Sequence, residues 1–382
     1  MLASARRMHH IITHPILLNY GGILQAYALQ RVVQGLGKPC SNIHYKPRFS
    51  FNNPRVRGIR SALKYWKPFI RKLVRPGDEI LNYHHYPFIH CLFRRHFMKY
   101  WVLDDERSLL HTLPQEDAFI VGSDQVWRAS HARILDSASH FFLGFASPQQ
   151  RSRSFAYAAS FGSDTWEGSA EETAECARLL KDFKTVSVRE HSGIRLCREI
   201  FGVEAVQMPD PTLLLEQEDY LHLCNHSWIR REKKTFIAAY LLDETPQTLQ
   251  LLNETAESLR FSIQHLKEHA DALHASDRLP LPIPQWLRYI ADSQCVLTDS
   301  FHGCVFSIIF NKPFVCLGNE LRGSARFESL LSTFGLQDRL VTKHDAAHIL
   351  NIMKSPIDWN QVNQIRQSEK ARAIHFIKES ID

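Results

Sequence analysis

A single histidine lies where an apolar run ends and an apolar helical segment begins. The run Cys295–Thr298 is followed by a short polar turn, then by His302 and Gly303, and helical spacing continues from Cys304 to Phe310. This order predicts a buried strand, a tight turn and a helix start, and ligands bind at such strand ends in open α/β sheets. Histidine exchanges protons near neutral pH. Backbone N–H groups at the helix start, those of Gly303 and Cys304, attract an anion.

Two further residues are candidates for the same chemistry. Asp299, in the turn, either orients His302 or a sugar hydroxyl, or caps backbone N–H groups. Arg189 follows the apolar segment 185–188, and its planar guanidinium suits a phosphate or a carboxylate. The alternative for Arg189 is a surface pair with Glu190, which contributes little to stability. We expect Arg189 and His302 to face each other across an open cleft.

Polar residues after two other predicted strands are candidates for binding a ligand. Asn19 and Gly21 lie in a loop after the segment 11–13, where glycine lets a ligand approach the backbone; tight helix entry is the alternative. Asp124 and Gln125 follow the segment 118–121 and are expected to bind hydroxyl groups. Trp127 either stacks on a sugar ring or belongs to the core.

Short apolar segments alternate with amphipathic helical patterns along most of the chain, which predicts parallel sheets. We expect an α/β protein with two doubly wound, Rossmann-like domains facing a cleft. The N-terminal domain covers residues 1–207 with a basic, aromatic helical insertion at about 47–113, the C-terminal domain covers 208–355, and a C-terminal helix covers 356–382. The predicted strands are 11–13, 118–121, 154–158, 185–188, 203–206, 236–240, 261–264, 296–297 and 312–317.

Composition narrows the class of protein. The chain has 382 residues, enough for two domains, and its hydrophobic share of 44% is that of an ordinary globular protein. The net charge of +6 is modest and the basic residues are scattered, which argues against nucleic-acid binding. The eight cysteines form no C-x-x-C pair, so buried thiols are expected and no metal site. No signal peptide or bilayer-spanning run is found, so we expect a cytoplasmic protein.

Six motifs in order give the chain a resemblance to a known family. They are Asn19 to Gln30, Gly122 to Trp127, Ser187 to Glu190, Asp210 to Leu213, Thr298 to Gly303 and Arg326 to Leu331. This set, spread over about residues 9–340, resembles the polysaccharide pyruvyl transferase family. The resemblance implies a GT-B-like fold and transfer of a pyruvyl group from phosphoenolpyruvate to a sugar hydroxyl in cell-surface polysaccharide biosynthesis, with no further cofactor.

The resemblance also implies roles for individual residues. The family's C-terminal histidine falls on His302, the proposed general acid or base with Asp299, and its phosphate-binding arginine looks like Arg189, with Gly303 nearby. Family members commonly show Arg-Leu-His-Gly at the histidine turn, whereas this chain has Ser300 in place of the arginine. The resemblance therefore assigns the missing charge to Arg322 or Arg326.

Two other functions stay possible besides pyruvyl transfer. The expected partners follow from pyruvyl transfer. The same two-domain shape supports a glycosyltransferase that uses a nucleotide sugar, with Glu328 as a carboxylate for the ribose. A catalytically inactive glycan-binding relative is the other alternative, favoured by Ser300. The expected partner is a sugar or a lipid-linked glycan acceptor, with peripheral association with membrane-bound glycan assembly enzymes at the inner membrane face.

Overall fold

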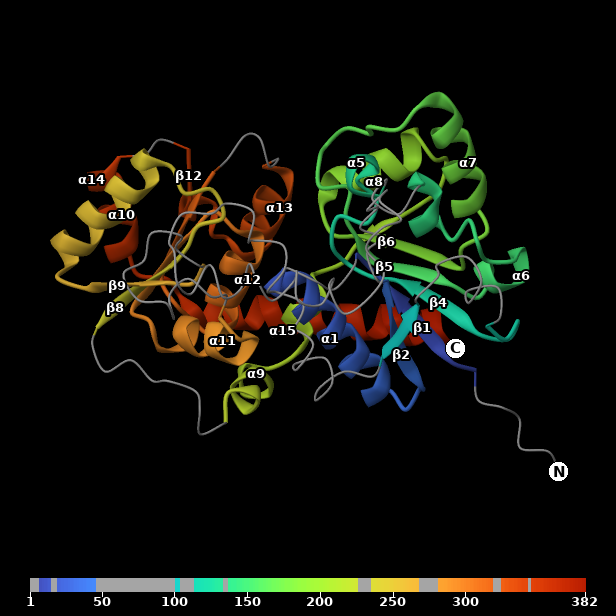
Figure 1. Ribbon diagram of the computed structural model, residues 1–382, viewed down its shortest axis with the longest axis horizontal. Coiled ribbons are helices and arrows are strands. Elements are labelled where there is room, and N and C mark those ends of the chain that lie inside the picture. Colours follow the sequence, from blue (N-terminus) through green and yellow to red (C-terminus); the bar gives the residue numbers. More distant parts are fainter. Residues whose placement is uncertain are drawn as a thin grey trace, which may run out of the picture.

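The computed structural model describes residues 7–14, 19–45, 100–103, 113–132, 137–225, 235–267, 281–318, 324–342 and 345–382. These residues form two parallel sheets, each packed between helices (Figure 1). The first sheet has seven strands in the order β3-β2-β1-β4-β5-β6-β7, and the second has five in the order β12-β11-β10-β8-β9. The expected α/β class with two doubly wound sheets is confirmed.

The N-terminal sheet is built from segments that are buried on both faces. β4 and β5 are buried at every position, which explains why they read as continuous apolar runs without alternation. Its strands are β1 (His9–Ile12), β2 (Cys40–Tyr45), β3 (Tyr100–Leu103), β4 (Ala118–Val121), β5 (Phe155–Ala159), β6 (Thr185–Val188) and β7 (Val206–Gln207). Its helices are α1 (Tyr20–Gly35), α5 (Ala129–Ala132), α6 (Pro148–Arg151), α7 (Ala170–Leu180) and α8 (His191–Glu199), with the 3-10 helix η3 (Ala138–Phe142).

The C-terminal sheet follows a short crossing segment that holds η4 (Pro211–Leu214) and α9 (Gln217–Leu223). Helix α10 begins at a capping box in which Thr245 and Thr248 bond each other's backbone N–H groups. The strands are β8 (Phe236–Tyr240), β9 (Ser262–His265), β10 (Cys295–Thr298), β11 (Phe314–Leu317) and β12 (Leu340–Val341). The helices are α10 (Pro246–Leu259), α11 (Ile283–Asp292), α12 (Phe301–Ile309), α13 (Ala325–Phe334) and α14 (Ala346–Lys354), with the 3-10 helix η7 (Gln337–Arg339).

Two strands depart from the sequence prediction. Residues Tyr100–Leu103, assigned to a helical insertion, form β3 and pair in parallel with β2, which is itself absent from the predicted strands. A four-residue strand is too short to show a period, so the sequence pattern does not separate it from the predicted insertion. The remainder of the predicted insertion, 47–99 and 104–112, lies outside the described residues.

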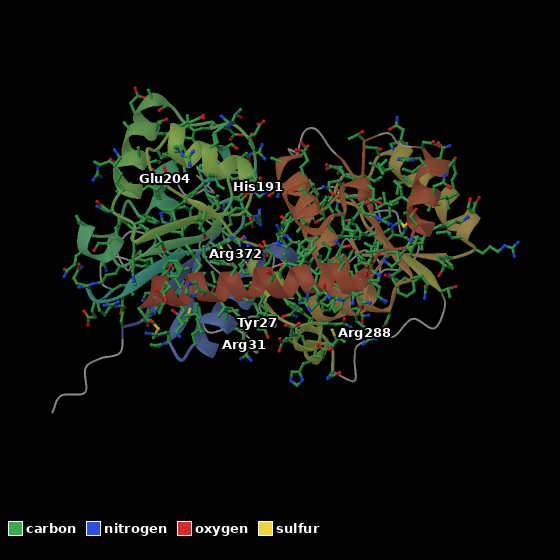
Figure 2. All side chains as sticks on the ribbon, turned by 180° about the vertical axis from the view of Figure 1, so that it is seen from behind. Tyr27, Arg31, His191, Glu204, Arg288 and Arg372 are labelled. Carbon is green, nitrogen blue, oxygen red and sulfur yellow. The ribbon has the colours of Figure 1, made fainter. Side chains whose placement is uncertain are left out.

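Helix α15 (Trp359–Ile381) runs along both domains instead of closing one of them (Figure 2). Its first half places Val362 in the core of the C-terminal domain, whereas Ala373, Ile377 and Ile381 pack against the N-terminal sheet. Arg372 donates to the carbonyl of Gln207 at 2.6 Å, in the strand just before the crossing segment. The helix therefore ties the two sheets together.

Helix α1 makes a second apolar connection between the domains. Its residues Tyr20, Ile23 and Leu24 share one hydrophobic cluster with Trp286 and Phe306 of the C-terminal domain. The rings of Tyr20 and Trp286 stack with centroids 5.2 Å apart, and the Tyr20 hydroxyl donates to the carbonyl of Leu281 at 2.9 Å. Since an apolar interface resists relative motion, the start of α1 has a fixed position against the C-terminal domain.

The cysteines and the lengths of the helices bear on two predictions from the sequence. The seven cysteines that the structure describes are buried free thiols, and Cys91 lies outside the described residues. No helix in the described part of the chain is long and apolar enough to cross a bilayer.

The buried histidines predict how stability depends on pH. Burial lowers the pKa of His140 to about 4, and burial together with nearby Arg7 and Lys38 lowers the pKa of His9 to about 4. Both residues are neutral in the folded and unfolded states above pH ~6.5. Between pH ~6.5 and 4 only the unfolded chain takes up the protons, so stability falls as the pH falls, by about 2 kcal/mol per residue between pH 6.5 and 5.

Urea unfolding between pH 7 and 5 measures this slope. His140→Gln should flatten it. An unchanged slope in His140→Gln would show that His140 titrates normally in the folded state.

Candidate active site

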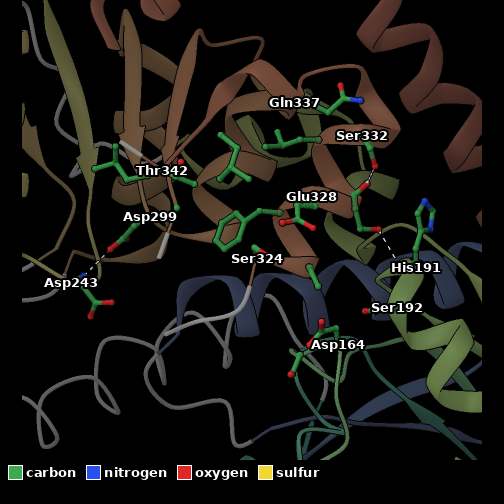
Figure 3. Close-up of a pocket in the computed structure, with 18 of the residues that line it drawn as sticks. Asp164, His191, Ser192, Asp243, Asp299, Ser324, Glu328, Ser332, Gln337 and Thr342 are labelled. Atoms are coloured by element: carbon green, nitrogen blue, oxygen red, sulfur yellow. Dashed lines mark hydrogen bonds between the residues drawn. The ribbon is translucent and has the colours of Figure 1, made fainter. Parts of the chain in front are cut away.

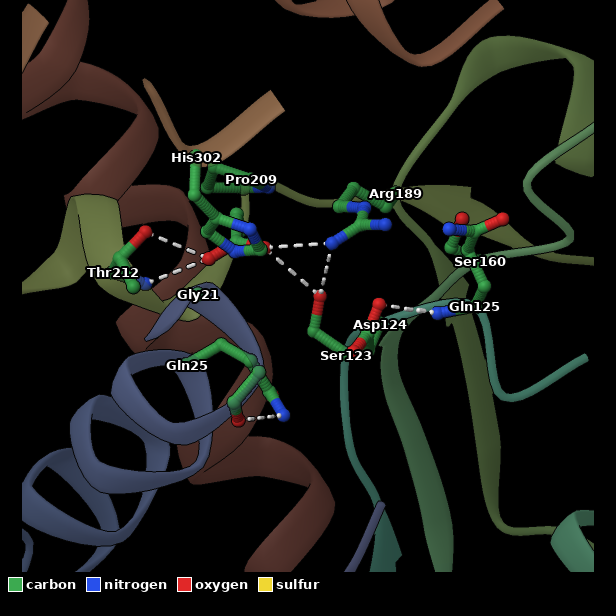
Figure 4. A network of polar contacts seen from close by, with 12 residues as sticks. Gly21, Gln25, Ser123, Asp124, Gln125, Ser160, Arg189, Pro209, Thr212 and His302 are labelled. Carbon is green, nitrogen blue, oxygen red and sulfur yellow. Dashed lines mark hydrogen bonds and ion pairs between the residues drawn. The ribbon is translucent and has the colours of Figure 1, made fainter. Parts of the chain in front are cut away.

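The carboxyl ends of strands from both sheets meet at one buried carboxylate. Arg189 follows β6 in the N-terminal sheet, and His302 lies in the first turn of α12, just after β10. Arg189 Nη1 donates to Asp210 Oδ2 at 2.9 Å, and His302 Nε2 lies 3.5 Å from the same oxygen (Figure 4). The distance from His302 is long for a hydrogen bond but short enough for a strong electrostatic interaction. The two residues expected to face each other thus meet through Asp210.

Both carboxylate oxygens of Asp210 accept hydrogen bonds from the protein. Its Oδ1 accepts from the Thr212 amide at 3.0 Å and hydroxyl at 2.7 Å, and its Oδ2 accepts from Ser123 Oγ at 3.1 Å. Burial favours the neutral acid, but His302, Arg189 and the Thr212 amide outweigh it and hold the pKa of Asp210 well below its usual range. Asp210 is therefore an anion fixed by the fold. The motif Asp210 to Leu213 contains this residue, but no pattern in the sequence predicts that Asp210 lies in the site.

A second arginine, Arg326, lies close to Arg189. Both guanidinium groups lie near the ring of Phe301, whose centroid is 4.4 Å from Arg189 Cζ and 5.9 Å from Arg326 Cζ. Burial, and then the charge of Arg189, lower the pKa of Arg326 to about 10. Arg189 Nε and Nη2 are buried and find no hydrogen-bond partner in the described part of the chain. The cluster therefore holds N–H donors suited to an anion. Arg322, the other candidate, lies outside the described residues.

The imidazole of His302 packs onto the start of α1 rather than onto a ligand. A Cβ atom at Gly21 would lie 1.9 Å from His302 Nδ1, so only glycine leaves room for the ring. Asn19 caps the same helix by accepting from the Gly21 amide at 3.0 Å. The expectation that Gly21 lines an open cleft floor is thus wrong: its missing side chain makes room for His302, and the Asn19 carboxamide oxygen is used in the cap.

Asp124 and Gln125 lie at the edge of this cluster. Asp124 adopts a left-handed backbone with φ 85°, and its carboxylate accepts from the Gln125 amide at 2.8 Å. Burial opposes its ionisation, but the charges of His14, Arg189 and His302 prevail and lower its pKa. Gln125 Oε1 accepts from Arg128 at 3.1 Å. Trp127 is fully buried in the core, so it cannot stack on a sugar.

The histidine turn is shaped by local backbone requirements. Both carboxylate oxygens of Asp299 accept backbone N–H groups, that of Leu242 at 2.6 Å and that of Asp243 at 2.8 Å, which is the capping alternative. A Cβ at Gly303 would lie 2.1 Å from Thr298 Oγ1, so glycine allows the turn to close. The Cys304 amide donates to the Ser300 carbonyl at 3.1 Å, so the expectation that it holds a phosphate is wrong.

A cleft of about 1100 Å³ lies between the domains beside this cluster (Figure 3). It is lined on one side by Asp164 and His191 and on the other by Asp243, Asp299 and Glu328. Arg189 and Arg326 instead border a cavity of only about 20 Å³, roughly the space of one water molecule. The side chains of Arg189 and His302 are 2% and 7% exposed. The expectation of an open site around them is therefore corrected: the cluster is sealed beside a large cleft.

The fold and this junction define a class of protein: two doubly wound domains whose strand ends meet at a cleft, a GT-B-like arrangement. Similar solved structures include UDP-GlcNAc 2-epimerase from Methanocaldococcus jannaschii, with 11% identity, a TM-score of 0.50, and 98% of this chain and 99% of that chain covered. The corresponding enzyme from Neisseria meningitidis, bound to UDP-GlcNAc, shows 11% identity, a TM-score of 0.49 and the same coverage. At such identities the likeness concerns the fold alone.

A third similar structure differs in length. The chain matches a mutant of the Thermobaculum terrenum O-GlcNAc transferase with 13% identity and a TM-score of 0.41, covering 97% of this chain but only 64% of that one. A search of curated proteins finds no significant match.

Comparison of the sequence with models of protein families identifies the family of this chain. The polysaccharide pyruvyl transferase family matches residues 19–320, which is most of the chain. The protein belongs to the polysaccharide pyruvyl transferase family.

The shared carboxylate gives a prediction about stability. Asp210→Ala should lower the free energy of unfolding by about 3–5 kcal/mol, because it leaves the buried guanidinium of Arg189 without its closest anion. Urea titration at pH 7 measures the loss. Glu175→Ala, which breaks an exposed pair with Arg178, is the matched control and should cost no more than about 1 kcal/mol. Equal losses in the two variants would contradict the role given to Asp210.

Proposed function

We propose that this protein transfers a pyruvyl group from phosphoenolpyruvate to a sugar hydroxyl in cell-surface polysaccharide biosynthesis. The observation that supports this best is the buried cluster of Arg189, Arg326 and His302 around the Phe301 ring, at the strand ends of both sheets. It combines cationic N–H donors with a proton carrier. The family membership points to the same chemistry.

The donor carries a phosphate and a carboxylate, and each needs fixed positive charge. Arg189 offers two nitrogens, Nε and Nη2, that lack partners in the described residues, and Arg326 Cζ lies 5.9 Å from the centre of the Phe301 ring. Phosphoenolpyruvate is many times larger than the cavity of about 20 Å³ beside them. Binding the donor there therefore requires Phe301 and Arg326 to move away from Arg189.

The polar side of the interface is where such a movement is easiest. Helix α8 and helix α13 meet there through a hydrogen bond from the His191 amide to Ser329 Oγ at 3.3 Å. The opposite side is held by the apolar contacts of α1 with Trp286 and Phe306. We propose that the donor enters from the α8–α13 side, next to the large cleft.

The reaction needs balanced proton transfers. One sugar hydroxyl adds to C2 of phosphoenolpyruvate while its C3 methylene receives a proton and becomes a methyl group. A second hydroxyl then displaces the phosphate, which leaves as HPO₄²⁻ with the second hydroxyl proton, and the product is a ketal. His302 is proposed to deliver a proton to C3 or to accept one from a hydroxyl. Asp124, charged and close to both His302 and Arg189, is proposed to bind an acceptor hydroxyl.

The acceptor and its cellular setting are also part of the proposal. The acceptor is proposed to be a sugar or a lipid-linked glycan, and the protein to work in the cytoplasm beside membrane-bound glycan assembly enzymes. The cleft of about 1100 Å³ has room for several sugar rings.

A second candidate function is glycosyl transfer from a nucleotide sugar. The observation in its favour is that Glu328, in the first turn of α13, lines the large cleft and offers a carboxylate for the ribose. Turnover of a nucleotide sugar without phosphoenolpyruvate would support it. A protein that binds glycans but turns over neither donor would be the inactive relative.

Acceptor-dependent release of phosphate from phosphoenolpyruvate tests the leading proposal. His302→Ala should lower kcat by about 10²–10⁴-fold, the usual contribution of a positioned acid or base. Arg189→Lys should instead raise the donor KM by roughly tenfold, because lysine cannot reproduce the fork of N–H donors.

Arg195→Lys is the matched control, since Arg195 is half exposed and pairs with Glu199 in α8. It should behave as the parent protein does. Phosphate release that does not depend on the acceptor, or an unchanged donor KM in Arg189→Lys, would overturn the corresponding assignment.

A further inference from the structure

We infer that Gly21 and Asp210 form a seat that positions His302 from the opposite domain. Neither residue is proposed to touch a substrate; both act on the imidazole. The steric and electrostatic parts of this inference stand on the structure alone, and its catalytic consequence rests on the proposed function.

The steric half of the seat is the bare backbone of Gly21. Three ring atoms of His302 lie within 2.5 Å of where a Cβ atom would stand, at 1.9 Å for Nδ1, 2.1 Å for Cγ and 2.5 Å for Cε1. Contacts under about 3 Å do not occur at real Cβ atoms, so the ring lies directly over the Gly21 Cα atom. The neighbouring Gly22 differs, since its Cβ would stand 3.2 Å from Asp124 Oδ2.

The electrostatic half of the seat is the carboxylate of Asp210. His302 lies in the first turn of α12 and packs on the first turn of α1, and both helix starts are positive ends that disfavour an imidazolium. Arg189 adds a further positive charge nearby. The anions that face this group are Asp210, at 3.5 Å from Nε2, and Asp124. Asp210 is thus the carboxylate that faces Nε2 of His302.

The seat is preformed because both of its parts are held independently of His302. Asp210 bonds Ser123, Arg189 and Thr212, whether or not the histidine is present. Gly21 is fixed by the Asn19 cap on one side and, through its neighbour Tyr20, by the stack on Trp286. A ring held on one face by backbone and at one nitrogen by a carboxylate has little freedom to rotate, which is the requirement for a positioned proton carrier.

A double-variant experiment tests the steric half without any assumption about the reaction. Gly21→Ala should lower the Tm of the parent protein by several degrees, since the new methyl group collides with the ring. In the His302→Ala background the ring is gone, so adding Gly21→Ala should cost nothing further. Gly35→Ala in the same helix is the matched control, because no atom lies within 4 Å of its Cβ position, and it should not lower the Tm. Equal losses with and without the ring would overturn the steric seat.

The electrostatic half is tested with Asp210→Asn, which keeps the shape of the side chain and removes its charge. The ¹⁵N chemical shifts of the His302 imidazole, assigned by their loss in His302→Ala, should change in Asp210→Asn. They should change less in Asp210→Glu, which restores the charge and serves if the asparagine variant does not fold. Unchanged ¹⁵N shifts would remove Asp210 from the seat.

Kinetics then tests the catalytic consequence. Gly21→Ala should lower kcat by on the order of 100-fold, as for a misplaced catalytic group, while the donor KM stays within about twofold. A raised donor KM with an unchanged kcat would refute the positioning role. If the parent protein transfers no pyruvyl group at all, the proposed function fails, while the Tm and ¹⁵N experiments still decide whether the seat exists.

Discussion

One buried carboxylate, Asp210, makes the junction between the domains possible. The interface brings the guanidinium of Arg189 and the imidazole of His302 together at two helix starts, which are themselves partly positive. Such groups are costly to bury unless an anion and hydrogen bonds offset the lost water. Asp210 supplies that anion, and the fold fixes it with the Thr212 amide and two hydroxyl groups. The geometry around Arg189 and His302 therefore depends on Asp210 staying ionised.

The elements that sequence reasoning locates well are those whose burial is uniform. β4, β6 and β8 have the predicted bounds, because each is an apolar run with its own end signals. β2 and β3 escape prediction, since Cys40–Tyr45 carries buried polar residues and Tyr100–Leu103 is short and aromatic. In neither strand does periodicity distinguish a strand from its surroundings. Likewise, nothing local in α15 indicates that its two halves pack on different sheets.

The sequence predicts which residues belong to the candidate site, but not which groups each of them contacts. Arg189 and His302 follow the strands that the sequence predicts, and the structure brings them to one carboxylate. Asn19 and Asp299 also lie where expected, yet their oxygens accept backbone N–H groups. A polar residue after a strand can bind a ligand or satisfy the chain, and sequence does not separate the two cases. Asp210 and Gly21 matter through contacts with His302, 92 and 281 residues away in sequence, which no local pattern encodes.

The two spaces at the junction differ in charge, and this difference bears on how two substrates are kept apart. The small cavity is bordered by two cations, Arg189 and Arg326, and one carboxylate, Asp210, whereas the large cleft is lined by Asp164, Asp243, Asp299 and Glu328. Among the described residues that line the cleft there is no lysine or arginine. A trianion such as phosphoenolpyruvate is repelled by those carboxylates and attracted to the guanidinium groups, while neutral sugar hydroxyls bond well to carboxylate oxygens. Under the proposed function, charge alone would direct the donor toward the buried cluster and leave the cleft to the acceptor. His302 lies 3.5 Å from Asp210, which borders the small cavity, so under the proposed function the imidazole is close to the donor.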